Sequence, residues 1–399
     1  MADVEFDPFS PTFFDDPYET YRRLRDEAPV YFSERYRFFA LTRYADVVAA
    51  HKDWSTFSSA HGVDLTTLST DPDLVASLRS IIMMDPPAHD RFRALVSRVF
   101  TPRAMQAMEP LVRRVVGTYL TALEGRRAFD AVGDLAGPFP VEIIAELLGV
   151  PAADRQQIRH WVDLMLHREP GDMRPTPTGI EASLALGGYF MALTAEKRVT
   201  PGDDLTSRLT QATVDRGDGE PTGLDDAEIA GFAALLGGAG AETVTKLLGN
   251  AFVLFHRHPD QWRKVREDPT LIGPAIEEVL RFWPPSQYQG RFSKAPATVG
   301  DQVVPAGFPV LLVTGAATRD ERFYDAPDAF RVERPPSQSL GFGVGVHSCL
   351  GAALARIESR VVLEEMVERW PRFQVDEAGL ERVQMSNVAG FSRVPVVVD

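Results

Sequence analysis

The chain has 399 residues, of which 44% are hydrophobic, 25% charged and 10% aromatic. This composition is typical of a globular protein with a large core, and it excludes a disordered, collagen-like or repeat-dominated chain. Asp and Glu outnumber Lys and Arg by 56 to 42, a formal net charge of −14. That charge argues against general nucleic-acid binding, which needs surplus cations to displace phosphate counterions. Neither a membrane span nor a signal peptide is recognisable, so we expect a cytoplasmic protein.

Helical periodicity dominates the chain, and the strand patterns are short. In chain order, the patterns predict a hairpin joining 30–32 to 38–41, helices over 104–124, 139–149, 151–166, 180–197 and 226–256, a second hairpin within 298–313, and a strand over 394–398. Two Pro/Gly-rich connections, 168–179 and 200–204, are too short to require a domain boundary. We therefore expect a mainly α fold with small β-sheets (α+β), organised as a single domain over 1–399.

The predicted helix over 226–256 is unusual in its middle. Asp225 and Glu228 have the spacing of a capping box, which marks the start of the helix. At about 1.5 Å per residue, such a helix is roughly 45 Å long and crosses the whole molecule. Its centre, residues 235–243, contains three glycines, each of which costs about 1 kcal/mol relative to alanine. Small residues there either admit a bulky group to the backbone or allow close helix packing.

Cys349 is the only cysteine, which excludes intramolecular disulfides, Cys-rich zinc sites and iron–sulfur clusters. A glycine-rich loop over 340–351 precedes a helical pattern, so the thiol is expected at a helix N-terminus, where its pKa should fall. The Walker loop, the dinucleotide glycine fingerprint, the hydrolase elbow and the zincin motif are absent. Cys349 is therefore a candidate metal ligand; a buried free cysteine, or a nucleophile with His347 as its base, is the alternative.

The cysteine loop also contains a longer motif. Phe342-x-x-Gly345-x-x-x-Cys349-x-Gly351 resembles the haem-ligand signature of the cytochrome P-450 superfamily. Glu278-x-x-Arg281, together with Arg334, resembles the structural triad of the same family. The resemblance implies the cytochrome P-450 fold, with a long central helix that crosses over a buried haem b, and it implies that Cys349 is the iron ligand.

The resemblance also assigns residues around the cofactor. It implies that the haem propionates are held by His89, Arg93, Arg291 and His347, and that the haem is further contacted by Ala239, Gly240, Phe342, Gly343, Cys349 and Gly351. It implies two catalytic residues on the long helix. Thr243 is expected to hydrogen-bond the oxygen substrate, and Glu242 to relay protons from solvent. An ordinary threonine that bonds back to a helix carbonyl is the alternative.

The activity implied by the resemblance is that of a haem-thiolate monooxygenase. One atom of O2 enters a hydrophobic small molecule of lipid, terpenoid, steroid or polyketide type. Electrons come from NAD(P)H through a reductase and a ferredoxin or flavodoxin. The substrate pocket is predicted at Met83, Leu235, Ala239, Gln287, Tyr288 and Val388, and a basic docking patch at Arg98, Arg103, Arg113, Arg114, Arg356 and Arg360.

Three alternatives to this activity are left open by the sequence. They are a peroxide-using or coupling enzyme on the same scaffold, a non-enzymatic haem protein, and a helical protein without a cofactor.

Overall fold

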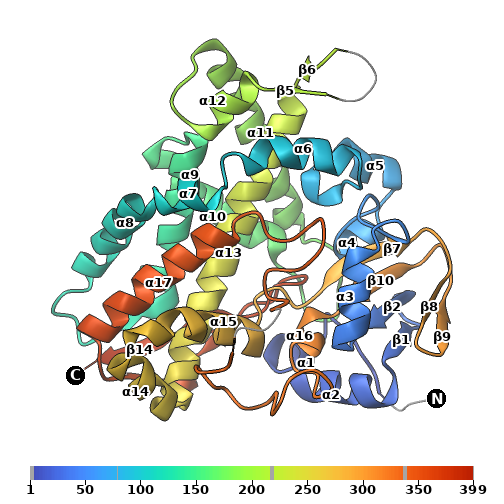
Figure 1. Cartoon of the computed structure of the whole chain (residues 1–399). Helices are drawn as coiled ribbons and strands as arrows, with labels where there is room; N and C mark the ends of the chain where they lie inside the picture. The colour runs from blue at the N-terminus through green and yellow to red at the C-terminus, as the bar shows by residue number, and fades with distance from the viewer. Residues whose placement is uncertain (1–3, 79, 216–219, 336–338, 399) are drawn as a thin grey trace.

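Helices form most of the molecule, and the strands gather in small sheets (Figure 1). The computed structural model describes residues 4–78, 80–215, 220–335 and 339–398. The α-helices are α1 (Pro11–Asp15), α2 (Tyr18–Glu27), α3 (Tyr44–Lys52), α4 (Leu65–Leu68), α5 (Pro72–Ser77), α6 (Ala88–Ser97), α7 (Pro102–Gln106), α8 (Glu109–Ala122), α9 (Pro138–Leu148), α10 (Arg155–Leu166), α11 (Pro177–Val199), α12 (Leu205–Thr210), α13 (Asp226–Arg257), α14 (Pro259–Glu267), α15 (Ile272–Phe282), α16 (Thr314–Ala317) and α17 (Ala352–Arg369). Short 3-10 or π turns are η1 (Ile81–Met83), η2 (Ala131–Ala136), η3 (Ala152–Asp154), η4 (Pro269–Leu271) and η5 (Glu377–Gly379).

The largest sheet has the strand order β1-β2-β10-β7-β3. Strand β10 lies between partners that are distant in sequence, because it pairs in parallel with β2 and antiparallel with β7. The strands are β1 (Val30–Ser33), β2 (Phe38–Leu41), β3 (Phe57–Ser58), β4 (Ala128–Asp130), β5 (Thr213–Val214), β6 (Thr222–Gly223), β7 (Gln289–Ser293), β8 (Ala297–Val299), β9 (Gln302–Val304), β10 (Pro309–Leu312), β11 (Phe373–Val375), β12 (Glu381–Arg382), β13 (Phe391–Arg393) and β14 (Pro395–Val398).

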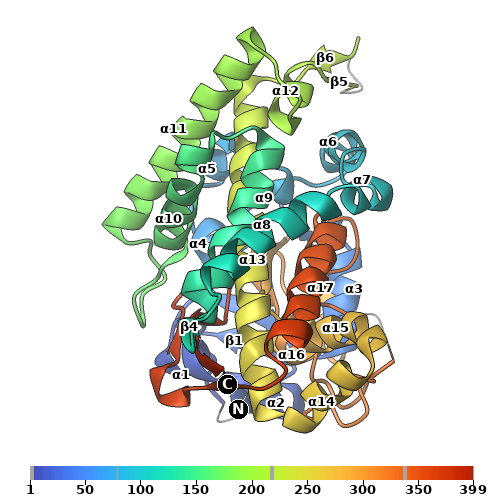
Figure 2. The ribbon, with the colours of Figure 1, turned by 90° about the vertical axis from the view of Figure 1, so that its left-hand side faces the viewer.

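Helix α13 is the axis around which the other helices pack (Figure 2). Its first turn contains the predicted capping box: the Asp225 carboxylate accepts from the Glu228 N–H, and the Glu228 carboxylate accepts from the Asp225 N–H, both at 2.9 Å. Along its length α13 contacts α9, α10, α11, α15 and α17. The prediction of a mainly α fold built on a long central helix is confirmed.

The three glycines of α13 serve close helix packing. A Cβ placed on Gly237 would lie 3.3 Å from the Phe190 ring of α11. A Cβ on Gly240 would lie 3.3 Å from the Ile144 side chain of α9. The small residues therefore allow helices α9 and α11 to approach the backbone of α13. Gly240 was expected at the haem, but its missing side chain points towards Ile144.

Two of the predicted elements are divided in the structure. The helix over 104–124 is broken into α7 and α8, and the second hairpin is limited to β8 and β9, which turn at Gly300 with φ +61°. The rest of that segment, β10, joins the large sheet instead. Local periodicity does not encode this pairing, because the partners of β10 are β2 and β7. Among the residues that the structure describes, no helix has the length and apolar character that crossing a bilayer requires.

Candidate active site

The cysteine loop is shaped by glycines with left-handed backbone angles. Gly343 has φ +66° and Gly345 has φ +78°, a region that L-residues with side chains rarely adopt. The Cys349 N–H donates to the Phe342 carbonyl at 2.8 Å, and this bond folds the loop back on itself. A Cβ on Gly345 would lie 2.5 Å from the His51 carbonyl oxygen, so the loop rests directly on the end of α3.

The Cys349 side chain faces space, not protein atoms. It is exposed although the loop leads directly into α17, which packs on the central helix α13. Although the side chain borders open space, the thiol lies deep among protein atoms, and this desolvation raises its pKa; the N–H groups of Gly351 and Ala352 and the guanidinium groups of Arg93 and Arg356 oppose the rise. The expected fall in pKa is therefore wrong for the free thiol, because desolvation outweighs the helix N-terminus. A cation at the sulfur is needed to favour the thiolate.

Helix α13 presents a second exposed position in its middle. Ala239 is exposed and Thr243 partly so, whereas Leu236, Ala241 and Val244 around them are buried. The Thr243 hydroxyl donates to the Ala239 carbonyl one turn earlier, at 2.9 Å. Residues four apart share one face of a helix. The face of Ala239 and Thr243 thus borders space that no described side chain fills.

A cluster of buried nitrogen donors lies beside the cysteine loop. His89 is 1% exposed, and its Nε2 has no hydrogen-bond partner among the described residues. The buried Nε2 of His347 also has no partner among them. The ring centroids of the two histidines lie 4.4 Å apart. Arg291 is 4% exposed, and the bond that the structure gives its guanidinium is to the carbonyl of Gly290, at 2.7 Å. Arg93 donates to the Ser348 carbonyl at 2.7 Å.

Electrostatics show that this donor cluster lacks its counter-charge. Burial lowers the pKa of Arg291 to about 10, and the Asp85 carboxylate opposes the shift. Burial and the positive charge of Arg291 lower the pKa of His347 to about 3. Buried donors are normally paired, so this cluster is built to receive an anion. Two carboxylates on a flat ligand that also reaches Cys349 match the cluster, and haem has this form.

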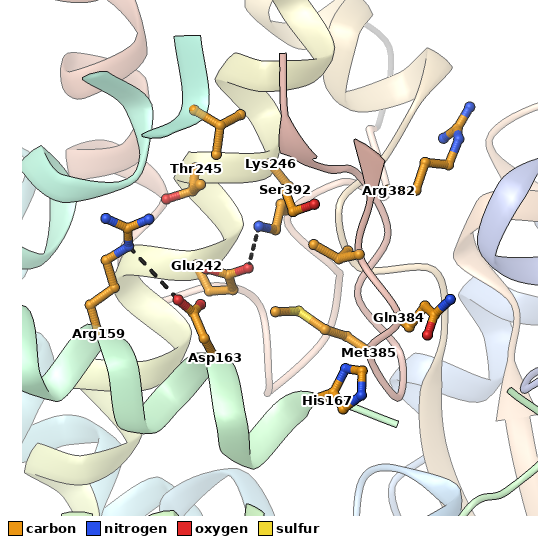
Figure 3. Close-up of a pocket in the computed structure, with 12 residues that line it drawn as sticks. Arg159, Asp163, His167, Glu242, Thr245, Lys246, Arg382, Gln384, Met385 and Ser392 are labelled. Atoms are coloured by element: carbon orange, nitrogen blue, oxygen red, sulfur yellow. Dashed lines mark ion pairs between the residues drawn. The ribbon is translucent and has the colours of Figure 1, made fainter. Parts of the chain in front are cut away.

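Glu242 points from α13 into a cavity, towards Lys246 and near Asp163 (Figure 3). It lines a polar cavity of about 340 Å³ whose walls come from α10, α13 and the segment 382–392. Its carboxylate lies 2.6 Å from the Lys246 ammonium, and both side chains are almost fully buried. Burial raises the pKa of Glu242; the charge of Lys246 opposes this rise and that of Asp163 adds to it. Lys246 was not among the residues predicted from the sequence, although its spacing from Glu242 is that of a helical ion pair.

Comparisons with known proteins agree with this geometry. The Cytochrome P450 family model matches residues 185–395, which include α13, Glu278, Arg281, Arg291 and Cys349. A putative cytochrome P450 123 of Mycobacterium tuberculosis is 41% identical over 397 residues, which cover 99% of this chain and 97% of the relative. The chain belongs to the cytochrome P450 family.

This P450 is also similar to other bacterial members of the family. A vitamin D(3) 25-hydroxylase of Pseudonocardia autotrophica is 36% identical over 413 residues, covering 99% of this chain and 96% of that one. The crystal structure of CYP109E1 from Bacillus megaterium in complex with testosterone superposes with a TM-score of 0.87 and 32% identity, covering 96% and 98% of the two chains. The predicted P450 fold, haem-thiolate cofactor and monooxygenase class are thereby confirmed.

The three residues of the predicted structural triad lie together. The Glu278 carboxylate accepts from Arg281 at 2.7 and 2.8 Å and from Arg334 Nε at 3.0 Å. It also accepts from the Arg331 N–H at 2.8 Å. The guanidinium groups in turn donate to carbonyls, among them those of Pro327 and Asp325. Glu278 thus connects α15 to the segment 325–334 that leads to the cysteine loop.

Some of the residues predicted to line the substrate pocket are partly exposed, and others are buried in the core. Leu235 and Met83 are partly exposed, and Val388 packs in a small apolar cluster with Val383, Met385 and Leu166. Tyr288 is completely buried near Phe13 and donates to the Ser386 carbonyl at 2.9 Å. Gln287 is buried as well, and its amide bonds Tyr21 and the Pro284 carbonyl. Tyr288 and Gln287 therefore have core roles, since their polar groups are already used there.

The predicted basic patch is largely neutralised by carboxylates. Arg113 and Arg360 share Glu109 and Glu364 across α8 and α17. Arg114 pairs with Glu146, and Arg356 with Glu277. Arg98 and Arg103 are exposed. The pairs of Arg113 with Glu109 and of Arg360 with Glu364 have the i,i+4 spacing that a sequence shows, whereas the other pairs join residues that are distant in the chain.

Proposed function

We propose that this P450 hydroxylates a hydrophobic molecule of steroid-like dimensions. Electrons are taken from NAD(P)H through a separate reductase and a ferredoxin or flavodoxin. The observation that carries the proposal is the exposed face of Ala239 and Thr243 in the middle of α13, together with the exposed Cys349. The vitamin D(3) 25-hydroxylase and the testosterone complex of CYP109E1 support the substrate class.

Each residue of the site has a separable task. Cys349 would hold the iron, and His89, Arg93, Arg291 and His347 would hold the propionates. When bound, the haem supplies the activation of dioxygen that inserts one oxygen atom into a C–H bond. In the balanced reaction, substrate, O2, NAD(P)H and one proton give the alcohol, water and NAD(P)⁺.

The chain's own contribution to proton supply lies in Thr243 and Glu242. The Thr243 hydroxyl donates its proton to the Ala239 carbonyl, so its oxygen remains able to accept a hydrogen bond on the open face of α13. The Glu242 carboxylate borders the polar cavity, where water can reach it. Small side chains such as that of Ala239 leave room on the open face, and apolar ones such as Leu235 keep bulk water away.

The proposal is tested by turnover of the purified haem protein. Testosterone and vitamin D(3) serve as probes, with NAD(P)H and a surrogate ferredoxin and ferredoxin reductase. We expect a monohydroxylated product, labelled from ¹⁸O2, with one O2 and one NAD(P)H consumed per product. Product formation with hydrogen peroxide alone, and none with the reductase system, would contradict the electron source and favour the peroxide-using alternative.

Replacing Thr243 with alanine is expected to uncouple electron use from oxidation. The variant loses the hydroxyl oxygen that can accept a hydrogen bond on the open face, so product per NAD(P)H should fall about 10-fold, less than the 100-fold or more of a full general acid–base group, while peroxide release rises. Thr243→Ser retains a hydroxyl and should recover most of the coupling. Equal coupling in all three proteins, measured as product, peroxide and NAD(P)H together, would show that Thr243 is only a helix residue.

A further inference from the structure

His51 is a buried histidine that the haem-binding residues named above do not include. It lies in the last turn of α3 and is 4% exposed. Neither Nδ1 nor Nε2 of its ring has a hydrogen-bond partner among the residues that the structure describes. An imidazole always carries at least one N–H, and buried polar groups are normally paired. The N–H of the ring therefore lacks an acceptor among the described residues.

The surroundings of His51 are those of the propionate cluster. Its carbonyl oxygen is the atom that a Cβ on Gly345 would meet, so α3 and the cysteine loop are in contact here. Burial lowers the pKa of His51 to about 3, with Arg291 and His347 as further lowering charges and the Gln289 amide as an opposing contact. The ring is thus neutral, and it lies near both Arg291 of β7 and His347 of the loop.

The protein groups near His51 that could accept its proton are engaged with other donors and form no hydrogen bond with the ring. The Gln289 amide donates to the Ser286 hydroxyl at 2.8 Å, and its oxygen accepts from the Thr314 hydroxyl at 2.7 Å. Asp85, whose charge acts on Arg291 and His347, is held by Ser58, the Ser59 N–H and Lys294. The nearby guanidinium of Arg291 has no acceptor atom. The missing acceptor is therefore an anion beside Arg291.

We infer that His51 donates a hydrogen bond to a haem propionate. It would add a residue of α3 to the propionate-binding set formed by His89 and Arg93 of α6 together with Arg291 and His347. The inference rests on the haem site described above. A neutral imidazole N–H suits a carboxylate acceptor, because hydrogen bonds to ionised acceptors are stronger than those between neutral groups. The bond would also link α3 to the cofactor, close to Gly345, where the cysteine loop rests on α3. His51 thus contributes to haem retention, not to the oxidation step.

The test measures haem loss from the purified haem protein to excess apomyoglobin. His51→Leu removes the ring nitrogens at similar size and is expected to release haem about tenfold faster, which corresponds to one charge-assisted hydrogen bond. His51→Gln keeps a donor and should stay within about threefold of the parent. His160→Leu, an exposed histidine on α10, is the matched control and should not change the rate.

A modified haem distinguishes the hydrogen bond of His51 to a propionate from the packing of its side chain. Apoprotein is reconstituted with haem dimethyl ester, in which both propionates are esterified and uncharged. Parent and His51→Leu should then lose the cofactor at similar rates. Equal rates with ordinary haem, or the same tenfold gap with the ester, would overturn the inference. If His51→Leu does not yield folded protein, the comparison of His51→Gln with His51→Phe on both cofactors decides by the same criteria.

These measurements do not depend on substrate oxidation. A protein that retains haem through His51 but oxidises neither testosterone nor vitamin D(3) would contradict the proposed function alone. Normal turnover with unchanged haem loss in His51→Leu would contradict the inference alone.

Discussion

Cys349→Ser is expected to abolish thiolate ligation and to reduce hydroxylation by at least about 100-fold. A serine hydroxyl is not ionised near neutral pH, so it would not supply the electron-rich thiolate that the haem iron requires for oxygen activation. The red-shifted absorption band of the reduced carbon monoxide complex, which reports a thiolate on the iron, should disappear. The measurement is the spectrum of the variant, followed by turnover with NAD(P)H and the surrogate donors.

Ser348→Ala is the matched control for this substitution. Ser348 precedes the cysteine, and its backbone carbonyl, which the substitution leaves in place, accepts from Arg93. We therefore expect the carbon monoxide band to remain at the parent position. A Cys349→Ser protein that still showed this band would contradict the assignment of the axial ligand.

Glu278→Gln is expected to destabilise the protein by about 3–5 kcal/mol, the usual penalty for removing one partner of a buried charge cluster. In the parent protein, the Glu278 carboxylate accepts hydrogen bonds from Arg281, Arg334 and the Arg331 N–H. The side chains of Glu278 and Arg281 are both almost fully buried. The amide retains the shape but leaves two guanidinium groups without their shared counter-charge. We expect a low yield of haem-loaded protein and a thermal unfolding midpoint lowered by several degrees.

The adjacent residue provides a control in the same helix. Glu277 pairs with Arg356 at 2.6 Å, and about half of the Arg356 side chain is exposed. Exposed ion pairs contribute only about 0–1 kcal/mol, so Glu277→Gln should unfold close to the parent midpoint. Equal midpoints for Glu277→Gln and Glu278→Gln would show that the Glu278 cluster contributes no more than a surface pair.

The parts of the fold that depend on local chemistry could be predicted from the sequence. The capping box at Asp225 and Glu228 gave the start of α13, and the glycine pattern around Cys349 gave the turn before α17. In both cases the controlling contacts lie within a few residues. The pairing of strand β10 was not predicted, for the opposite reason: its partners β2 and β7 are far away in the chain.

Site residues that belong to a sequence motif could be predicted. Residues whose role depends on their position in the tertiary structure could not. Gln287 and Tyr288 follow the Pro284-Pro285 turn as pocket candidates, but the structure uses their polar groups in the core. Lys246 had the spacing of an ion-pair partner for Glu242, yet its burial could not be seen without helix α10 and the segment 382–392. The neutral character of the arginine patch likewise depends on Glu109 and Glu364, which come from different helices.

Neighbouring residues of α13 face two unlike compartments. Thr243 and Ala239 border the open apolar side, whereas Glu242 and Lys246 border the polar cavity, because successive residues of a helix point about 100° apart. Helix α13 therefore separates the space beside Ala239 and Thr243 from the cavity that Glu242 and Lys246 line. Substitutions at Leu235 or Ala239 can thus reshape the first space and leave the buried ion pair of the second in place.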